Sequence, residues 1–193
     1  VVSTQSTGIN AEYGEMSQKM KVILIGDSGV GKTNLIIRFA KNQFQNQEIA
    51  TIGGAQLQKS IIINNQQIIL NIWDTAGQER YRSVVRQYFA GSQLCLIVFD
   101  LAQGLQSRYW IDQAKQIPNC KLALVGNKCD LAHRVSGREI ADELGIDYFE
   151  VSALSGEKVH DLFQQMCEEA LQYVQEVPEV VLQKVQQHKT CCM

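Results

Sequence analysis

The chain has 193 residues, with 18 Lys and Arg against 20 Asp and Glu, so its formal net charge is -2. This balance excludes a polybasic protein that binds nucleic acid through its phosphates, because no surplus of positive charge is present. Hydrophobic residues make up 45% of the chain and charged residues 20%, which is ordinary globular usage and excludes disorder throughout. The length predicts one domain with tails.

Residues 1–18 are polar and aperiodic, and we expect them to form a flexible N-terminal tail. They contain no basic region followed by an apolar stretch, so no secretory signal is expected. The longest apolar runs have the length of strands and fall short of the roughly 20 residues of a spanning helix. Four cysteines are spaced for neither a zinc site nor a disulfide framework: Cys95, Cys120, Cys129 and Cys167. These features predict a cytoplasmic protein.

From residue 19 to 176, short β-rich runs alternate with amphipathic stretches, which predicts one α/β domain of three layers with a mostly parallel sheet. The expected strands are residues 21–25, 57–63, 68–74, 94–100, 121–127 and 148–152. Only residues 64–67 separate the second strand from the third, so these two should be antiparallel. A stripe of apolar residues predicts a last helix over residues 157–175 that packs on the sheet. Residues 177–193 are expected to be a second flexible tail.

A glycine-rich loop follows the first strand. Residues 26–33 read GDSGVGKT, which satisfies G-x-x-x-x-G-K-[ST] between a strand and a helix. The glycines let the backbone turn its amides toward phosphate oxygens, and the helix adds its positive end. Lys32 can then reach the β- and γ-phosphates, and Thr33 can offer a hydroxyl to Mg²⁺. The residues expected to bind phosphate are Ser28, Gly29, Val30, Gly31, Lys32, Thr33, Asn34 and, from a later loop, Gly77.

The residues after the fifth strand predict which base is bound. Asn127, Lys128 and Asp130 lie where the carboxyl edge of the sheet can hold a base. Guanine presents two neighbouring N–H donors that one carboxylate at Asp130 can accept, whereas adenine presents an acceptor that would leave the charge unpaired. Asn127 would tie this loop to the phosphate loop, and the Lys128 stem can lie along the purine. Alone, the four residues could equally form a turn or a helix entry.

A third motif ends the third strand, where residues 73–79 read WDTAGQE. Asp74 can hold Mg²⁺ through water, and the Gly77 amide can meet a γ-phosphate. Together with GDSGVGKT, the TIG at Thr51, NKCD and the Ser152-Ala153 pair, this motif resembles the Rab branch of Ras-like small GTPases over roughly residues 20–175. The GQERYRS segment is most similar to the endosomal members. The resemblance implies the P-loop GTPase fold, with a six-stranded sheet, one antiparallel edge strand and about five helices.

The resemblance also implies roles for individual residues. Thr51 is expected to join Thr33 and Asp74 as a Mg²⁺ ligand when a γ-phosphate is present. Gln78 would orient the attacking water, so the implied catalytic residues are Gln78, Lys32 and Thr51. The residues implied to contact guanine are Phe44, through its ring, and Ser152, Ala153 and Leu154, with Leu154 standing where many relatives have Lys.

An effector-facing surface is implied at Ile52, Gln56, Trp73 and Tyr88. Family members usually have an aromatic residue where this chain has Gln56, and two glycines precede it. Trp73 could equally be an ordinary core residue. The stretch between Asp100 and Pro118 is also shorter than is usual for the family.

The chain ends Thr190-Cys191-Cys192-Met193, which is not a C-a-a-X box. It resembles the paired-cysteine tails that Rab proteins use for double geranylgeranylation, so Cys191 and Cys192 are the expected lipidation sites. One lipid alone would anchor only marginally. The alternative is an unmodified tail.

The resemblance implies a switch that binds GTP and GDP with Mg²⁺, hydrolyses GTP slowly without an activating protein, and recruits effectors in vesicle traffic. It further implies an exchange factor, an activating protein, a GDP-dissociation inhibitor and a prenylation escort protein as partners. The protein is expected to be a monomer that binds no nucleic acid and acts at the cytosolic face of intracellular membranes, with endosomes as the expected compartment. Two alternatives stay open: an ATP-using phosphotransferase, against which NKCD argues, and a nucleotide-locked scaffold, against which Gln78 argues.

Overall fold

The computed structural model describes residues 18–46, 51, 54–78, 85–132 and 134–176. The expected lipidation sites Cys191 and Cys192, the effector-facing Ile52, and the tails apart from Gln18 lie outside these residues. Gln18 already belongs to the first strand.

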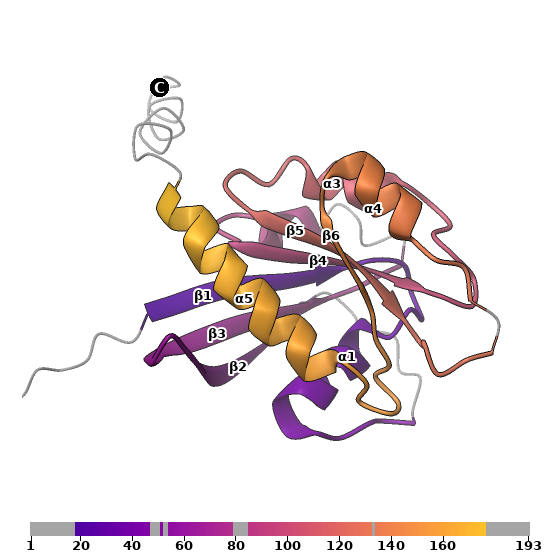
Figure 1. Cartoon of the computed structure of the whole chain (residues 1–193), viewed down its shortest axis with the longest axis horizontal. Helices are drawn as coiled ribbons and strands as arrows, with labels where there is room; N and C mark the ends of the chain where they lie inside the picture. The colour runs from indigo at the N-terminus through magenta and orange to yellow at the C-terminus, as the bar shows by residue number, and fades with distance from the viewer. Residues whose placement is uncertain (1–17, 47–50, 52–53, 79–84, 133, 177–193) are drawn as a thin grey trace, which may run out of the picture.

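A six-stranded sheet forms the middle layer of the domain, as predicted, in the order β2-β3-β1-β4-β5-β6 (Figure 1). Strands β1, β3, β4, β5 and β6 run parallel, and β2 at the edge is antiparallel to β3. The strand bounds are β1 Gln18–Ile25, β2 Gly54–Ile63, β3 Gln66–Thr75, β4 Leu94–Asp100, β5 Lys121–Asn127 and β6 Asp147–Glu150. The mixed sheet expected from the sequence is therefore confirmed.

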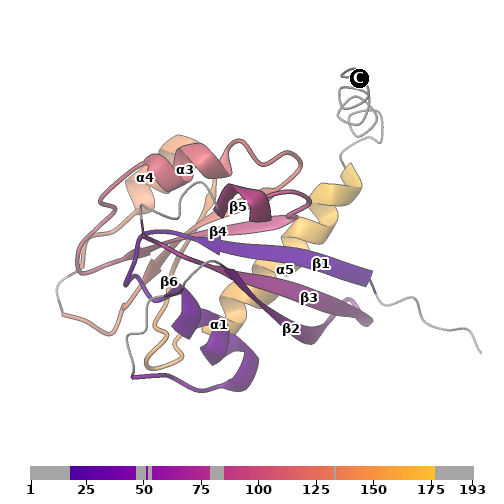
Figure 2. The ribbon, with the colours of Figure 1, turned by 180° about the vertical axis from the view of Figure 1, so that it is seen from behind.

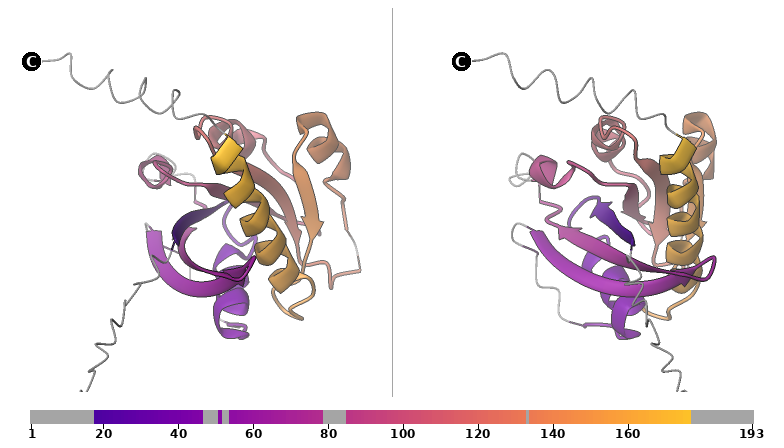
Figure 3. Two further views of the ribbon diagram at one scale, coloured as in Figure 1. Left: turned by 60° about the vertical axis from the view of Figure 1, so that its left-hand side comes forward. Right: turned by 90° about the vertical axis from the view of Figure 1, so that its left-hand side faces the viewer.

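The connection between β2 and β3 is tighter than the four residues suggested. Strand β3 begins at Gln66, and the turn consists of Asn64 and Asn65, whose φ angles are 49° and 61°. Asparagine tolerates this left-handed conformation better than most residues, and two-residue turns of this kind match the twist of antiparallel strands. Figure 3 shows how strongly the paired strands curve.

Strand β6 is shorter at its end than expected. It stops at Glu150 rather than at Ser152. The Ser152 amide donates instead to the Glu157 carbonyl oxygen at 3.1 Å, within the loop that leads to the last helix. The chain therefore leaves the sheet before the serine that the sequence placed in the strand.

Helices cover both faces of the sheet (Figures 1 and 2). The described residues contain four α-helices, against about five expected: α1 Lys32–Lys41, α3 Tyr109–Ala114, α4 Arg138–Leu144 and α5 Val159–Glu176. A short 3-10 helix, η2 Arg86–Tyr88, follows β3, and residues 79–84 before it lie outside the described part. Within the described residues, no helix is long and apolar enough to cross a membrane.

Two hydrophobic clusters hold the three layers together. Met20, Val22 and Leu24 of β1 pack with α1 and α5 on one face, and Ile23 and Ile25 pack with α3 and α4 on the other. This alternation follows from the period of two along a strand. Because β1, β3, β4, β5 and β6 are parallel, the loops at their carboxyl ends meet at one edge of the sheet, where the predicted motifs lie.

Candidate functional site

The phosphate loop joins β1 to α1 and depends on glycine at Gly31. This residue has φ 95° and stands at the N-terminal end of α1. A Cβ added to Gly31 would lie 2.3 Å from the Asn127 side-chain nitrogen, closer than atoms can approach. Its neighbour Val30 is buried, whereas Ser28 and Gly29 are exposed to solvent at the loop. The loop and the amino end of a ten-residue helix are thus brought together as the motif predicts.

Lys32 is held inside this loop. Its Nζ donates hydrogen bonds to the Gly26 and Asp27 carbonyl oxygens, both at 2.8 Å. Burial lowers the pKa of Lys32 to about 8, although the negative charges of Asp74 and Asp27 oppose that shift. A buried cation held by neutral carbonyl oxygens is well placed for an anionic ligand, which would restore the charge balance lost on burial.

The three predicted metal ligands converge from different elements. Thr33 Oγ1 donates to Asp74 Oδ2 at 2.7 Å, and Thr51 Oγ1 donates to the same oxygen at 3.2 Å. The two threonine oxygens are 3.1 Å apart. Thr33 comes from α1, Asp74 from the end of β3, and Thr51 from the segment before β2.

This donor set fits Mg²⁺. Asp74 Oδ1 is buried and has no hydrogen-bond partner among the described residues, so one carboxylate oxygen is left over in the cluster. Burial raises the pKa of Asp74, while the hydrogen bond from Thr33 and the charge of Lys32 lower it. Mg²⁺ prefers hard oxygen ligands and binds through one or two carboxylates plus phosphate oxygens. Clusters of three or more His, Cys, Asp or Glu that could hold another metal are absent from the described part of the chain.

The backbone at Gly77, just after β3, lies directly against the phosphate loop. A Cβ on Gly77 would lie 2.4 Å from the Asp27 carbonyl carbon and 2.5 Å from the Ser28 nitrogen. Only glycine fits such a close approach. Gln78 follows and is half-buried at the same edge. The Gly77 backbone is therefore positioned where the sequence placed the phosphate contact.

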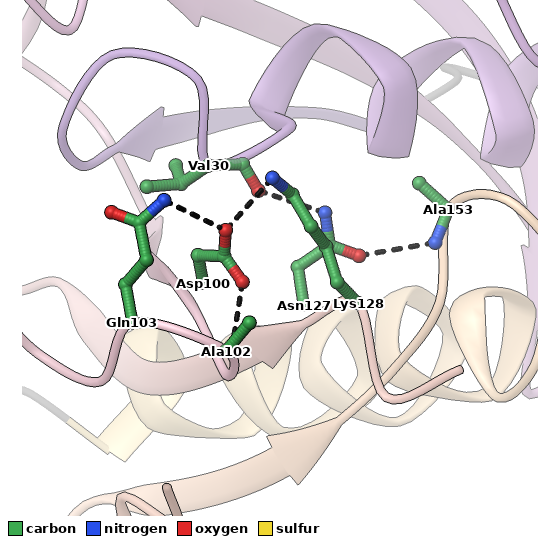
Figure 4. A network of polar contacts seen from close by, with 7 residues as sticks. All are labelled: Val30, Asp100, Ala102, Gln103, Asn127, Lys128 and Ala153. Atoms are coloured by element: carbon green, nitrogen blue, oxygen red, sulfur yellow. Dashed lines mark hydrogen bonds and ion pairs between the residues drawn. The ribbon is translucent and has the colours of Figure 1, made fainter. Parts of the chain in front are cut away.

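Asn127 links the base loop to the phosphate loop, as predicted (Figure 4). Its Nδ2 donates to the Val30 carbonyl oxygen at 2.8 Å, and its Oδ1 accepts from the Ala153 amide at 3.0 Å. Only 1% of Asn127 is exposed, so both bonds are shielded from water. A guanine contact from the Ala153 amide would share that donor with Asn127.

Lys128 has a partner that the sequence reasoning missed. Its Nζ lies 2.8 Å from Asp100 Oδ2 (Figure 4), and Asp100 Oδ1 accepts from the Ala102 amide at 2.9 Å. The ion pair fixes the direction of the Lys128 stem. The signal was present in the sequence, because an acidic residue that ends an apolar parallel strand lies at the site edge of the sheet.

The remaining residues predicted to contact guanine are Asp130, Ser152, Leu154 and Phe44. Asp130 is exposed, and its Oδ1 accepts a hydrogen bond from Ser152 Oγ at 2.5 Å, so these two are brought together. Leu154 is 52% exposed. Phe44 is partly buried and packs against the hydrophobic cluster under α1 and α5.

Three of the predicted effector-facing residues lie close together: Gln56 of β2, Trp73 of β3 and Tyr88 of η2. Gln56 pairs with Trp73 across the strands, and the Trp73 ring lies 5.0 Å from the Tyr88 ring. A Cβ on Gly54 would come within 2.8 Å of Tyr88, so this glycine makes room for the ring. Gln56 donates to Asn71 Oδ1 at 3.1 Å, which gives the surface a polar side. Trp73 is half-buried and also contacts the core.

A second missed contact reaches the phosphate loop from α3. The Trp110 indole nitrogen donates to Asp27 Oδ1 at 2.9 Å. The two residues are 83 positions apart, and no motif spacing announces the pair. It links the phosphate loop to the short helix on the other face.

The four described cysteines are free, as expected. Burial raises the pKa of Cys120 and of Cys167 to about 12, and the pKa of Cys129 to about 11 with Glu157 adding to the shift. Thiols with such pKa values stay protonated at neutral pH and are weak metal ligands and nucleophiles.

Comparison with known proteins supplies an independent line of evidence. The profile of the Ras family matches residues 21–172. Ras-related protein Rab5A from rice is 36% identical over 84% of this chain and 85% of its own length. Ras-related protein RabG2 from Dictyostelium discoideum is 38% identical over 77% of this chain and 81% of its own length. GTP-binding protein ypt3 from fission yeast is 38% identical over 83% of this chain and 79% of its own length.

Proposed function

Because the chain belongs to the Rab branch of the Ras family of small GTPases, we propose that it is a GTP/GDP switch that hydrolyses GTP slowly. Membership of this family makes it a small GTPase of membrane trafficking, with guanine nucleotide and Mg²⁺ as its ligands. The observation that carries the finer proposal is the meeting of Thr33, Thr51 and Asp74 beside a phosphate loop that Asn127 ties to the base loop.

The geometry supports a division of labour among the residues at the phosphate end. Lys32 and the amides of the phosphate loop bind the β- and γ-phosphates, and Gly77 adds an amide from the segment that follows β3. Thr33, Thr51 and Asp74 would hold Mg²⁺, which neutralises charge on the phosphate oxygens when it is bound. Gln78 orients the water for in-line attack on the γ-phosphate.

The same geometry supports a guanine site at the base end. Asp130 accepts the two neighbouring donors of guanine and is itself oriented by Ser152. Lys128 is held by Asp100, so that its stem can lie along the purine. Phe44 and Leu154 are proposed to border the base. Because Thr51 and Gly77 meet the phosphate end from outside the phosphate loop, the segments that carry them can respond to loss of the γ-phosphate.

The wider assignment rests on family membership. We propose that residues 19–176 form the GTPase domain between tails 1–18 and 177–193, and that Cys191 and Cys192 carry lipids. The expected partners are an exchange factor, an activating protein, a GDP-dissociation inhibitor, a prenylation escort protein, and effectors bound at Ile52, Gln56, Trp73 and Tyr88. The similarity to relatives named Rab5 supports a proposed location of this chain at the cytosolic face of endosomal membranes.

Calorimetry with GTP and with ATP, followed by single-turnover hydrolysis, tests this proposal. We expect tight binding of GTP, no measurable binding of ATP, and slow hydrolysis by the isolated chain. Equal retention of both nucleotides would favour a phosphotransferase, and binding of GTP without any turnover would favour a locked scaffold. Fast unaided hydrolysis would contradict the expected need for an activating protein.

A further inference from the structure

Arg38 of α1 contacts the loop that follows β6, more than a hundred residues away in the sequence. Its Nε donates to the Ala153 carbonyl oxygen at 2.9 Å, and its Nη2 donates to the Leu154 carbonyl oxygen at 2.6 Å. The remaining Nη1 donates to the Asn42 carbonyl oxygen at 3.1 Å. The planar guanidinium therefore uses all three nitrogens at once, which suits its rigid fork of donors.

The two carbonyls belong to the loop between β6 and α5, which Asn127 also contacts through the Ala153 amide. Leu154 is 52% exposed. Gly156 and Lys158 both have left-handed backbone conformations, with φ 89° and 52°. A Cβ on Gly156 would lie 3.3 Å from Arg38 Cδ, so the loop folds closely over the arginine side chain. Its position relative to the rest of the site depends on contacts made from outside the loop.

The peptide groups around Ala153 are held from two sides. Asn127 Oδ1 accepts from the Ala153 amide at 3.0 Å, and Arg38 binds the Ala153 carbonyl oxygen at 2.9 Å. Asn127 is also bonded to Val30 in the phosphate loop. Arg38 lies six positions after Lys32 on one rigid helix, about 9 Å along its axis. Both contacts thus connect the loop after β6 to the phosphate loop. The first contact does so through the Asn127 side chain, and the second through Arg38 and α1.

The geometry points to Arg38 as a positioning residue for the guanine end of the site. Among the described residues, the hydrogen bonds of Arg38 go to Asn42, Ala153 and Leu154 and not to the predicted metal ligands, so Arg38 acts on the base through the backbone of Ala153 and Leu154. Arg38 therefore sets how long a guanine nucleotide stays bound, without taking part in hydrolysis. This inference rests on the proposed binding of guanine nucleotides.

The test uses the full chain and measures the dissociation rate of fluorescent GDP in the presence of excess GDP and Mg²⁺. Arg38→Met keeps most of the aliphatic stem and removes the donors, and we expect release about 10- to 100-fold faster than from the wild type, because charged hydrogen bonds to two carbonyls are lost. Arg38→Lys keeps the charge but cannot bond both carbonyl oxygens with the same geometry, so its GDP dissociation rate should lie between those of the wild type and Arg38→Met. Arg108→Met is the matched control, because Arg108, which directly precedes α3, pairs with exposed Glu143 of α4 and does not contact this loop among the described residues.

Two further readouts separate positioning from general damage to α1. The single-turnover hydrolysis rate of preloaded GTP should equal that of the wild type, since Lys32 and Thr33 at the other end of the helix are untouched. The fold increase in release should be the same with Mg²⁺ and with a chelator, because independent sites contribute additively. A fall in the hydrolysis rate, or an Arg38 effect that disappears on chelation, would overturn the inference in favour of a role at the phosphates.

The remaining outcomes also decide the matter. Release from Arg38→Met within about twofold of the wild type would overturn the inference while leaving the proposed function intact. A wild type that does not retain GDP at all would instead refute the proposed function. If Arg38→Met fails to fold, the Arg38→Lys variant decides alone. A GDP dissociation rate and a hydrolysis rate that both equal those of the wild type would then overturn the role proposed for the guanidinium.

Discussion

Asp130 is the residue on which the proposed choice of guanine depends. Its carboxylate is exposed at the end of the base loop and is oriented by the Ser152 hydroxyl. Ser152 Oγ in turn accepts from the Ser155 amide at 3.0 Å, so the acceptor is held by a short chain of bonds rather than by burial. A site that accepts two donors rejects a base that cannot supply them.

Replacing the Asp130 carboxylate by an amide should therefore change which base the site prefers. Asp130→Asn is expected to weaken GTP binding by at least about 100-fold, because the amide places a donor opposite the N–H groups of guanine. Xanthosine triphosphate, which offers an oxygen at that position, should bind the variant better than the wild type. Calorimetry with both nucleotides measures this, and unchanged GTP affinity would remove Asp130 from the base site.

The oxygens of Thr33, Thr51 and Asp74 lead to a prediction about metal removal. Chelation of Mg²⁺ should speed GDP release by about tenfold or more, because the ion links the protein to the phosphates. In Asp74→Ala, release should already be fast and should respond little to the chelator. Stopped-flow fluorescence of labelled GDP provides the rates, and a wild type indifferent to chelation would show that the cluster does not hold a catalytic ion.

The residues within motifs were predictable because fixed spacing ties them to one strand end. Thr33 follows the loop after the first predicted strand and Asp74 ends the third, and the strands that carry such motifs share one edge of the sheet. Asp100 ends a predicted strand, so the sequence could have placed it at the site edge, but its pairing with Lys128 and the contact of Trp110 with Asp27 depend on packing between distant segments. Sequence spacing does not encode such contacts.

The elements of the domain were predictable to different degrees. Strand β4 is buried at each of its seven positions, and a continuous apolar run of that length between turns is easy to recognise. Helix α3 has six residues and lies in the stretch that is shorter than usual for the family. So short a helix shows no clear period, and its position is set by Trp110 and Ile111 in the core.

Lys121 joins three elements and should stabilise the domain. Its Nζ lies 2.8 Å from Asp147 Oδ2 of β6 and 2.8 Å from Glu169 Oε2 of α5. We expect Lys121→Met to lower the free energy of unfolding by about 1 kcal/mol at pH 7, as for a partly exposed network. Arg108→Met, which removes an exposed pair, should leave the unfolding midpoint unchanged. Denaturant titration measures both.

The pH dependence of the Lys121 effect has a defined sign. Partial burial lowers the pKa of Lys121, but hydrogen bonds and charges from Asp147 and Glu169 raise it more, so the net pKa lies above 10.5. A raised lysine pKa means that the folded state binds the proton more tightly. The difference between wild type and Lys121→Met should be full below pH 10.5 and should shrink as the pH rises through the folded pKa. A difference that grows at alkaline pH would contradict the ion-pair explanation.

At the scale of the whole molecule, the sequence predicted the arrangement of layers better than the surface it presents. The mixed sheet and its antiparallel edge followed from connection lengths, which topology rules convert directly into neighbours. The surface around Gln56, Trp73 and Tyr88 did not, because the hydrogen bond to Asn71 and the room made by Gly54 depend on the register of β2 against β3.

The proposed attachment to membranes is a property of the whole chain. Changing both Cys191 and Cys192 to Ser should move the expressed protein from the membrane fraction to the supernatant. Either single change should give partial release, because one lipid chain supports only marginal binding. Fractionation of cells that express the tagged full-length variants measures this. A double variant that still sediments with membranes would favour an unmodified tail.

The two asparagines that turn β2 into β3 have a consequence for the order in which the domain assembles. Hairpins close on the microsecond timescale because their partners are adjacent in the chain. Strand β1 pairs with residues fifty positions away, with Gln18 opposite Ile68. Closing this longer loop costs more conformational entropy than closing the hairpin. We expect the β2–β3 hairpin to form first during folding. Strand β1 then pairs with β3, and the other strands of the sheet pair afterwards.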